Sequence, residues 1–228
     1  EEYKIDTYHV NKTNLCEAKN IQLIHIFEDE WRDKQDIVKS RLSGLLNMNT
    51  VIYARDCECR EVSSQDAMKF LNENHLQGAI GSMYRYGLYY NDKLVSLMTF
   101  GKSRFNENEF ELLRFCNVLW THIIGGASKL FTHFLRDHQE INEIISYADR
   151  RWSRGQVYEK LGFIKDSISK PSYYYIIDNC RENRVHYQKH ILIEQGYDST
   201  KSEHDIMLER GIYRIYDCGT LKYRYVRK

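Results

Sequence analysis

Apolar and polar positions alternate over residues 87–101, on both sides of Asn91 and Asp92. A period of two is typical of a strand that buries one face, and an Asn-Asp pair favours a tight turn. The pattern therefore predicts a β-hairpin. Alternating or continuous apolar runs predict further strands over residues 21–27, 51–62, 110–117, 143–148 and 171–177.

Helical periodicity is clearest over residues 127–138, where Leu130, Phe131, Phe134 and Leu135 form one apolar stripe. Other helices are expected over residues 8–16, 28–46, 67–74 (with an N-terminal cap at residues 63–66) and 153–161, and residues 181–210 are expected to form a charged helical connector. Together these elements predict an α+β fold in which a sheet is flanked by helices.

A small-residue turn connects the strand at 110–117 to the helix at 127–138. Gly125, Gly126 and Ala127 let a ligand approach the backbone, and the N–H groups of a first helical turn favour an anion. Ser128 and Lys129 follow, so a hydroxyl and an ammonium group would meet a phosphate there. A tight turn without a ligand, with a solvated Lys129, is the alternative.

The spacing His122-x-x-Gly125-x-Ala127 resembles the Gln/Arg-x-x-Gly-x-Gly/Ala loop of the GNAT acyltransferases. In that superfamily the loop holds the pyrophosphate of acetyl-CoA. The resemblance implies a GNAT-like fold with a mixed, mainly antiparallel sheet flanked by helices. Two departures from the pattern are His122 in the place of Gln or Arg and Gly126 in a variable position.

Residues 157–163 (VYEKLGF) are similar to a helix end of the same superfamily, whose tyrosine often serves as general acid to the CoA thiolate. The resemblance covers roughly residues 51–178 and implies that Tyr158 has this role, a buried core tyrosine being the alternative. It also implies acetyl-CoA or a related CoA thioester as cofactor. The residues expected to bind it are His122, Gly125, Gly126, Ala127, Ser128 and Lys129.

Residues 146–158 resemble a segment of GNAT-like phage proteins, including the Mom-type enzymes that modify adenine in DNA, and of phage homing-endonuclease-like proteins. Within it, Asp149 would act on the acceptor, Arg150 or Arg151 would hold phosphate, and Trp152 would stack on a base. Asp149 as an N-cap is the alternative. Arg114, on a predicted strand, is a candidate catalytic residue together with Asp149 and Tyr158. If it points inward it needs a partner, either a phosphate or a carboxylate such as Asp149, and it is otherwise on an exposed face.

Two more side chains follow the predicted helix at 67–74. His75 and Arg85 would contact the acceptor substrate if this helix and loop cover the acceptor site, as the GNAT-like interpretation implies. Solvated or capping roles are the alternatives.

The segment 8–31 resembles the second half of the very-short-patch-repair-like PD-(D/E)XK nucleases. The acidic strand that supplies the main metal ligand in such nucleases is not found, so nuclease activity is not expected from this chain alone. Three interpretations stay open. The chain is a fragment of a longer nuclease, or a nuclease half or a second copy of the chain completes that fold, or the segment only supports the next domain. The expected domains are therefore residues 1–47 (nuclease-like), 48–180 (GNAT-like) and 181–228 (connector and tail).

The 228-residue composition, with 42% hydrophobic and 29% charged residues and a net charge of +1, is ordinary for a globular protein. No apolar run approaches the roughly 20 residues of a membrane span and no signal peptide is visible, so a cytoplasmic protein is expected (host cytoplasm if phage-encoded). The six cysteines are expected to be reduced, and no metal site is expected, because Cys57 and Cys59 lack a second matching pair.

Basic residues and tyrosines alternate near the C-terminus, where Lys222 and Arg224 lie among four tyrosines. Such a stretch suits phosphate contact and base stacking. DNA is the partner that the resemblance to the phage proteins implies. An edge strand or hairpin with a solvated basic face is the alternative. Two functions thus compete: CoA-dependent group transfer to nucleic acid, and a non-catalytic DNA-binding module that targets a homing endonuclease.

Overall fold

The computed structural model describes residues 5–103, 106 and 109–227. It divides into two compact units: unit 1 (Glu1–Asp29, Asp149–Arg154, Ile168–Thr220) and unit 2 (Glu30–Ala148, Gly155–Ser167, Leu221–Lys228). Each of the three segments expected from the sequence (1–47, 48–180 and 181–228) contributes residues to both units. The division follows contacts between distant parts of the chain, which local sequence patterns do not report.

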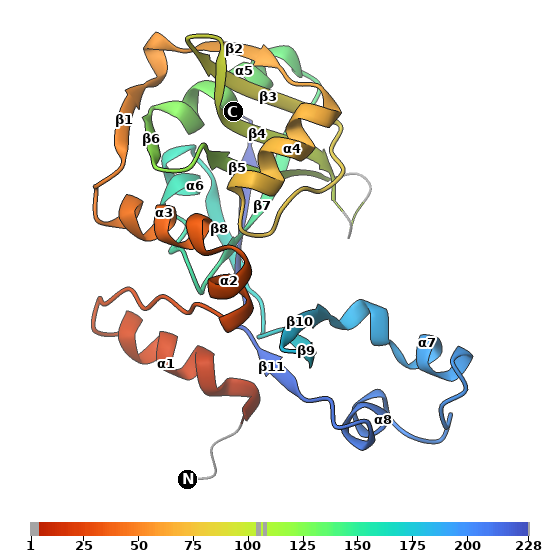
Figure 1. Ribbon diagram of the computed structural model, residues 1–228. Helices are drawn as coiled ribbons and strands as arrows, with labels where there is room; N and C mark the ends of the chain where they lie inside the picture. The colour runs from red at the N-terminus through yellow and green to blue at the C-terminus, as the bar shows by residue number, and fades with distance from the viewer. Residues whose placement is uncertain (1–4, 104–105, 107–108, 228) are drawn as a thin grey trace. The chain divides into compact units, whose positions relative to one another are not determined.

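Unit 2 is built on a mixed sheet flanked by helices (Figure 1). Its seven strands have the order β2-β3-β4-β5-β7-β12-β8; the β2/β3, β3/β4 and β4/β5 pairs are antiparallel and β5/β7 is parallel. The expected α+β class with a mixed, mainly antiparallel sheet is confirmed. The elements are α2 (Glu28–Asp33), α3 (Gln35–Leu45), β1 (Thr50–Tyr53), η2 (Ala54–Asp56), β2 (Glu58–Glu61), α4 (Ser64–Asn74), β3 (Tyr84–Tyr90), β4 (Lys93–Lys102), β5 (Phe110–Asn117), β6 (Thr121–Ile124), α5 (Gly126–Asp137), β7 (Glu143–Asp149), α6 (Gln156–Lys160), β8 (Ile164–Ile168) and β12 (Thr220–Val226).

The predicted hairpin is β3 and β4. Asn91 and Asp92 have φ values of 49° and 57°, the left-handed conformation that both central residues of a type I′ turn require. Along β4, successive side chains face opposite sides of the sheet, so Leu97 packs in the cluster of α4 while Met98 packs in that of α5. The sheet is thereby covered on both faces (Figure 1).

The end of the basic C-terminal stretch, with Lys222 and Arg224, forms β12, a strand between β7 and β8 rather than an edge strand of this sheet. Tyr223 on this strand is fully buried, and the Tyr225 ring packs edge-on against Phe131 of α5 at 5.0 Å between centroids. Half of the tyrosines expected at a nucleic-acid surface therefore belong to the core. The alternation seen in the sequence is that of a strand, but this strand lies inside the sheet and is not the edge strand of the alternative interpretation.

Three predicted elements are wrong in detail. Residues 21–27 form no strand, although Phe27 is buried; residues 28–46 form two helices, α2 and α3, separated at Lys34; and residues 51–62 form two short strands around η2. Apolar pattern alone does not reveal these breaks, because they depend on which partner strand the fold supplies.

Unit 1 holds a three-stranded sheet of order β10-β9-β11, with β9 (Tyr173–Ile177) antiparallel to both neighbours. Its core contains Tyr175, whose hydroxyl donates to Glu203 at 2.7 Å. The half-buried Arg214 donates to that same hydroxyl. The segment predicted as a helical connector thus includes a strand as well as helices. The remaining elements of unit 1 are η1 (Ile5–Thr7), α1 (Tyr8–Glu17), β10 (Cys180–Asn183), η3 (Arg184–Tyr187), α7 (Lys189–Glu194), α8 (Glu203–Glu209) and β11 (Arg214–Tyr216).

Candidate functional site

The glycine turn forms the N-terminus of α5. Gly125 is the N-cap residue, with φ 78° and no side-chain cap, and the helix's first hydrogen bond runs from the Lys129 N–H to the Gly125 carbonyl at 3.0 Å. A Cβ on Gly126 would lie 2.9 Å from Ile123 Cγ2, so this position has no room for a side chain. The N–H groups of the first turn precede that hydrogen bond and are available to an anion.

Lys129 is engaged within the protein. Its ammonium group donates to the carbonyls of Ala54 (2.9 Å) and Cys57 (2.5 Å), which fixes the η2 turn against α5. Ser128 is exposed on the first turn. A phosphate at this helix end would therefore meet backbone N–H groups and the Ser128 hydroxyl first, with the Lys129 charge behind them.

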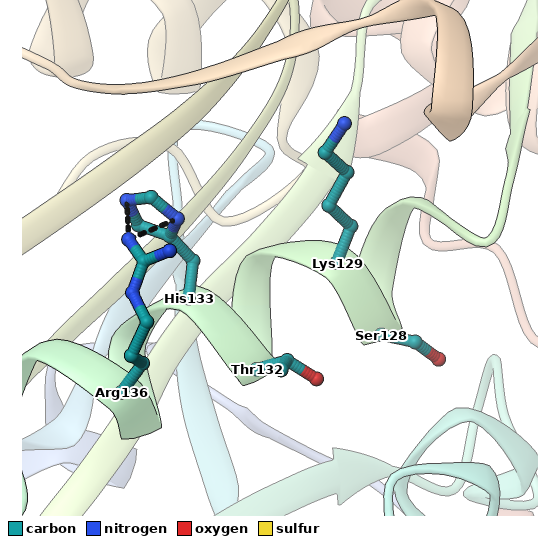
Figure 2. A pocket seen from close by; sticks show the side chains of 5 residues that line it. All are labelled: Ser128, Lys129, Thr132, His133 and Arg136. Carbon is teal, nitrogen blue, oxygen red and sulfur yellow. Dashed lines mark hydrogen bonds between the residues drawn. The ribbon is translucent and has the colours of Figure 1, made fainter.

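A hollow of about 440 Å³ runs along the polar side of α5 (Figure 2). It is lined by Ser128, Lys129, Thr132, His133 and Arg136. The Arg136 guanidinium lies 3.0 Å from the His133 ring (Figure 2). The hollow continues from the N-terminus of α5 towards its C-terminal end and has a basic lining.

Tyr158 of α6 lies where β5 and β7 part. The register between these strands covers two pairs, Phe110↔Ile144 and Glu111↔Ile145, and the next bridge is a side chain, Ser146 Oγ, which donates to the Leu112 carbonyl at 2.8 Å. The Tyr158 hydroxyl donates to the Tyr147 carbonyl at 3.4 Å. Burial raises the pKa of Tyr158, so its hydroxyl stays protonated at neutral pH.

Glu111 is a candidate that the sequence analysis missed. Its side chain is buried at the last backbone pair between β5 and β7, Glu111↔Ile145, and its negative charge adds to the rise in the Tyr158 pKa. A charged residue within the apolar strand pattern of residues 110–117 was the available signal. Glu111 and Tyr158 together place a carboxylate and a phenol at the opening between β5 and β7.

Arg114 lies on the same strand. Its guanidinium donates to the carbonyls of Gly78 (3.2 Å) and Leu113 (2.8 Å), and its positive charge opposes the rise in the Tyr158 pKa. It therefore holds the 75–79 loop in place near Tyr158. A direct part in the reaction stays a prediction.

His75 and Arg85 are also bound to backbone. His75 Nδ1 accepts from the Gln77 N–H at 3.2 Å, and burial, with Arg114 and other cations nearby, lowers its pKa to about 3. Arg85 donates to the carbonyls of Val62 and Ser82. Both side chains shape loops, and their contact with substrate stays a prediction.

The cluster at residues 149–152 is part of unit 1 and is largely buried. Asp149 accepts from the Arg151 backbone and guanidinium (2.9 and 2.8 Å), while Arg150 donates to Glu17 at 2.8 Å and to the Cys218 carbonyl. Arg150, Arg151 and Trp152 are 7%, 3% and 4% exposed. Phosphate or base contact at these residues would require the ion pairs to open, so their contacts favour a structural role.

The two basic residues expected to contact DNA through the tail are ion-paired on β12. Lys222 lies 3.7 Å from Asp166, and Arg224 pairs with Glu109, Glu143 and Asp166. Their charge is therefore largely neutralised within the sheet. Nucleic-acid contact at these positions stays a prediction.

His25 of unit 1 has a strongly perturbed pKa. Its Nε2 bonds to Thr13 Oγ1 at 2.9 Å, and burial, together with His9 and Arg151, lowers its pKa from 6.5 to about 4. The folded state thus prefers the neutral imidazole.

We expect unit 1 to lose stability as the pH falls from about 6.5 towards 4, because the unfolded chain takes up the His25 proton first. The stabilising contribution of the neutral His25 side chain is fully present above pH 6.5. Urea unfolding at pH 7.5 and pH 5, followed by Trp152 fluorescence in a Trp31→Phe, Trp120→Phe background, would measure the drop. His25→Gln should show a smaller drop between the two pH values than the parent; equal drops would contradict the assignment.

Among the described residues, no three His, Cys, Asp or Glu side chains are placed to hold a metal ion, and no helix is both long and apolar enough to cross a membrane. All six cysteines are free thiols.

No family model and no curated protein matches this chain. Solved structures similar to it include a Bacillus subtilis acetyltransferase in complex with CoA (13% identity, TM-score 0.43, 75% of this chain and 98% of that one). A second is a GNAT family acetyltransferase from Elizabethkingia anophelis with acetyl-CoA bound (10% identity, TM-score 0.44, 75% of this chain and 99% of that one). A third is an N-acetyltransferase from Staphylococcus aureus Mu50 (10% identity, TM-score 0.45, 75% of this chain and 99% of that one). The similarity concerns the arrangement of helices and strands. The resemblance to Mom-type proteins, phage proteins and a nuclease half stays a prediction.

Proposed function

We propose that unit 2 is a GNAT-like acyltransferase that uses acetyl-CoA or a related CoA thioester. The N-terminus of α5 would hold the pyrophosphate at the N–H groups of Gly126, Ala127 and Ser128. The observation that carries this proposal is the order along the chain: an open, glycine-lined helix N-terminus, followed by a protonated tyrosine where β5 and β7 part.

The chemistry assigned to the residues is a transfer of two protons. The bound thioester supplies an activated acyl group. Glu111 would accept the proton of the attacking amine, and Tyr158 would donate its hydroxyl proton to the departing sulfur. Proton transfer from Glu111 to Tyr158, directly or through solvent, would restore both groups. Among the candidates, Glu111 is preferred to Asp149 as the base because it belongs to the same unit as Tyr158 and influences its pKa.

Nucleic acid as the acceptor rests on the resemblance of residues 146–158, and no contact described above adds to it. The second function, a non-catalytic DNA-binding module, has no supporting observation of its own. The DNA-binding module becomes the better explanation if the protein binds DNA but does not bind CoA.

The cofactor site is tested by Ser128→Glu. A carboxylate on the first turn repels phosphate, yet it is favourable to the helix dipole, so binding should fall without loss of stability. We expect acetyl-CoA affinity to drop about tenfold or more by calorimetry. In thermal shift assays, acetyl-CoA at about a hundred times its Kd should add roughly 2.7 kcal/mol to the parent.

Thr132→Glu is the matched control, because Thr132 is exposed one turn further along the same face of α5. It adds the same charge away from the N–H groups and should bind acetyl-CoA much more tightly than Ser128→Glu. Equal losses in the two variants would place the phosphates elsewhere. A parent protein that does not bind acetyl-CoA would overturn the proposal.

A further inference from the structure

The small ribbon formed by β1 and β6 has one exposed face. Its parallel register places Val51 opposite His122 and Tyr53 opposite Ile124. Since side chains alternate along a strand, these four lie on one face, and the intervening Ile123 points to the core and is 5% exposed. On the outer face Val51, Tyr53 and Ile124 are 49%, 45% and 42% exposed. We call these four residues the ribbon face.

The ribbon face adjoins the N-terminus of α5. Ile124 directly precedes Gly125, and a Cβ on Gly125 would lie 3.7 Å from that of Ala54, the residue after Tyr53. The two hydrogen bonds from Lys129 hold this turn in place. Tyr53 is therefore fixed beside the first turn of α5 rather than on a freely moving loop.

Arg55 adds a cation to this surface. Its guanidinium carbon lies 4.8 Å from the centroid of the Tyr53 ring, and the side chain is 79% exposed. Its ion pair with Asp56 is long, at 3.8 Å, and also exposed, so it contributes little and opens readily. An exposed aromatic ring with a guanidinium beside it suits a flat base that carries phosphate.

We propose that the ribbon face and Arg55 bind the nucleotide end of CoA: the adenine stacks on Tyr53, and Arg55 contacts the ribose 3′-phosphate. This inference rests on the proposed function. An acyl or pantetheine chain would use apolar contacts but not the cation. A purine bisphosphate uses both, and a pyrophosphate at the adjacent helix end would bring it within reach of this face. The exposed apolar side chains of the ribbon face, which belong to none of the core clusters formed by the described residues, thus have an occupant of matching shape and charge.

The test uses adenosine 3′,5′-bisphosphate, which carries the nucleotide without the pantetheine arm. We expect Tyr53→Ala to weaken its binding about 5- to 100-fold, the effect of losing one stacked base. Tyr213→Ala is the control, because Tyr213 is an exposed tyrosine (66%) of unit 1, and should bind as the parent does. Arg55→Ala should bind the bisphosphate about tenfold or more weakly than the parent does. Its affinity for adenosine 5′-monophosphate, which lacks the 3′-phosphate, should change little.

The outcomes separate this inference from the proposed function. Equal binding of the bisphosphate by the parent and Tyr53→Ala, or binding of acetyl-CoA without any binding of the bisphosphate, would overturn the inference and leave the acyltransferase proposal standing. Tyr53-dependent binding of the bisphosphate with no turnover of acetyl-CoA would leave this inference standing and overturn the acyltransferase proposal. A single-stranded oligonucleotide that binds through Tyr53 while the bisphosphate does not would overturn it in favour of an acceptor site.

Discussion

Glutamine in place of Glu111 is expected to slow acyl transfer about 100- to 10,000-fold while acetyl-CoA binds as before, because the variant keeps the shape of the side chain but accepts no proton. The measurement is the release of CoA thiol from acetyl-CoA in the presence of an amine acceptor, resolved into kcat and KM. Loss in kcat alone is the signature of a base that acts only during the reaction.

Tyr158→Phe is the companion variant, since it removes the hydroxyl and keeps the ring. Because the Tyr158 pKa is raised, the parent rate should not fall until the pH exceeds about 10, the ordinary tyrosine value. A full rate in Glu111→Gln would exclude this residue as the base. Asp149→Asn then tests the carboxylate that the sequence singled out.

Alanine in place of Gly155 is expected to cost about 3 kcal/mol or more of folding stability. Gly155 caps α6 with φ 81°, and an added Cβ would overlap the ring and hydroxyl of Tyr223, which is buried in β12. Both the backbone conformation and the space exclude a side chain. Urea unfolding of unit 2 would measure the loss.

Gly162→Ala at the other end of α6 is the matched control. Gly162 also has a positive φ, 86°, but an added Cβ there would meet Tyr225 at an ordinary 3.7 Å. It should lose only about 1 kcal/mol, for the backbone strain alone. If the two variants lose the same stability, contact with Tyr223 is not the cause.

Elements defined by neighbouring residues were predictable. The hairpin of β3 and β4 follows from alternation around Asn91 and Asp92, and the α5 helix follows from a single apolar stripe after two glycines. The Ser63 cap of α4 is likewise present, with its side chain accepting from the Asp66 N–H at 3.1 Å. In each case the signal lies within a few residues.

Elements that depend on distant pairing partners could not be predicted from the sequence. Residues 21–27 have the apolar content of a strand but form none, while the tail strand β12 lies between β7 and β8, which precede it by many residues. The sequence pattern shows that a segment is suited to strand pairing, but it does not show which strand is its partner.

The candidate site divides in the same way. The helix N-terminus at Gly125 and the position of Tyr158 on a helix could be predicted, because both are local motifs. The importance of Glu111 could not, since it depends on α6 bringing Tyr158 to β5. Conversely, the sequence indicated that Arg150 could bind phosphate. In the structure its guanidinium donates to Glu17 and Asn14, which lie over a hundred positions away in the chain.

The position of β12 also bears on how the protein is made. During synthesis β7 and β8 leave the ribosome well before the strand that separates them in the finished sheet. Until residues 220–226 emerge, the two strands have exposed edges and the space for Tyr223 is empty, so a nascent chain of this kind is open to wrong pairing. A nascent chain stalled before residue 220 should therefore bind a chaperone. A chain stalled on a linker added after residue 228, which brings residues 220–226 out of the ribosome, should no longer bind it.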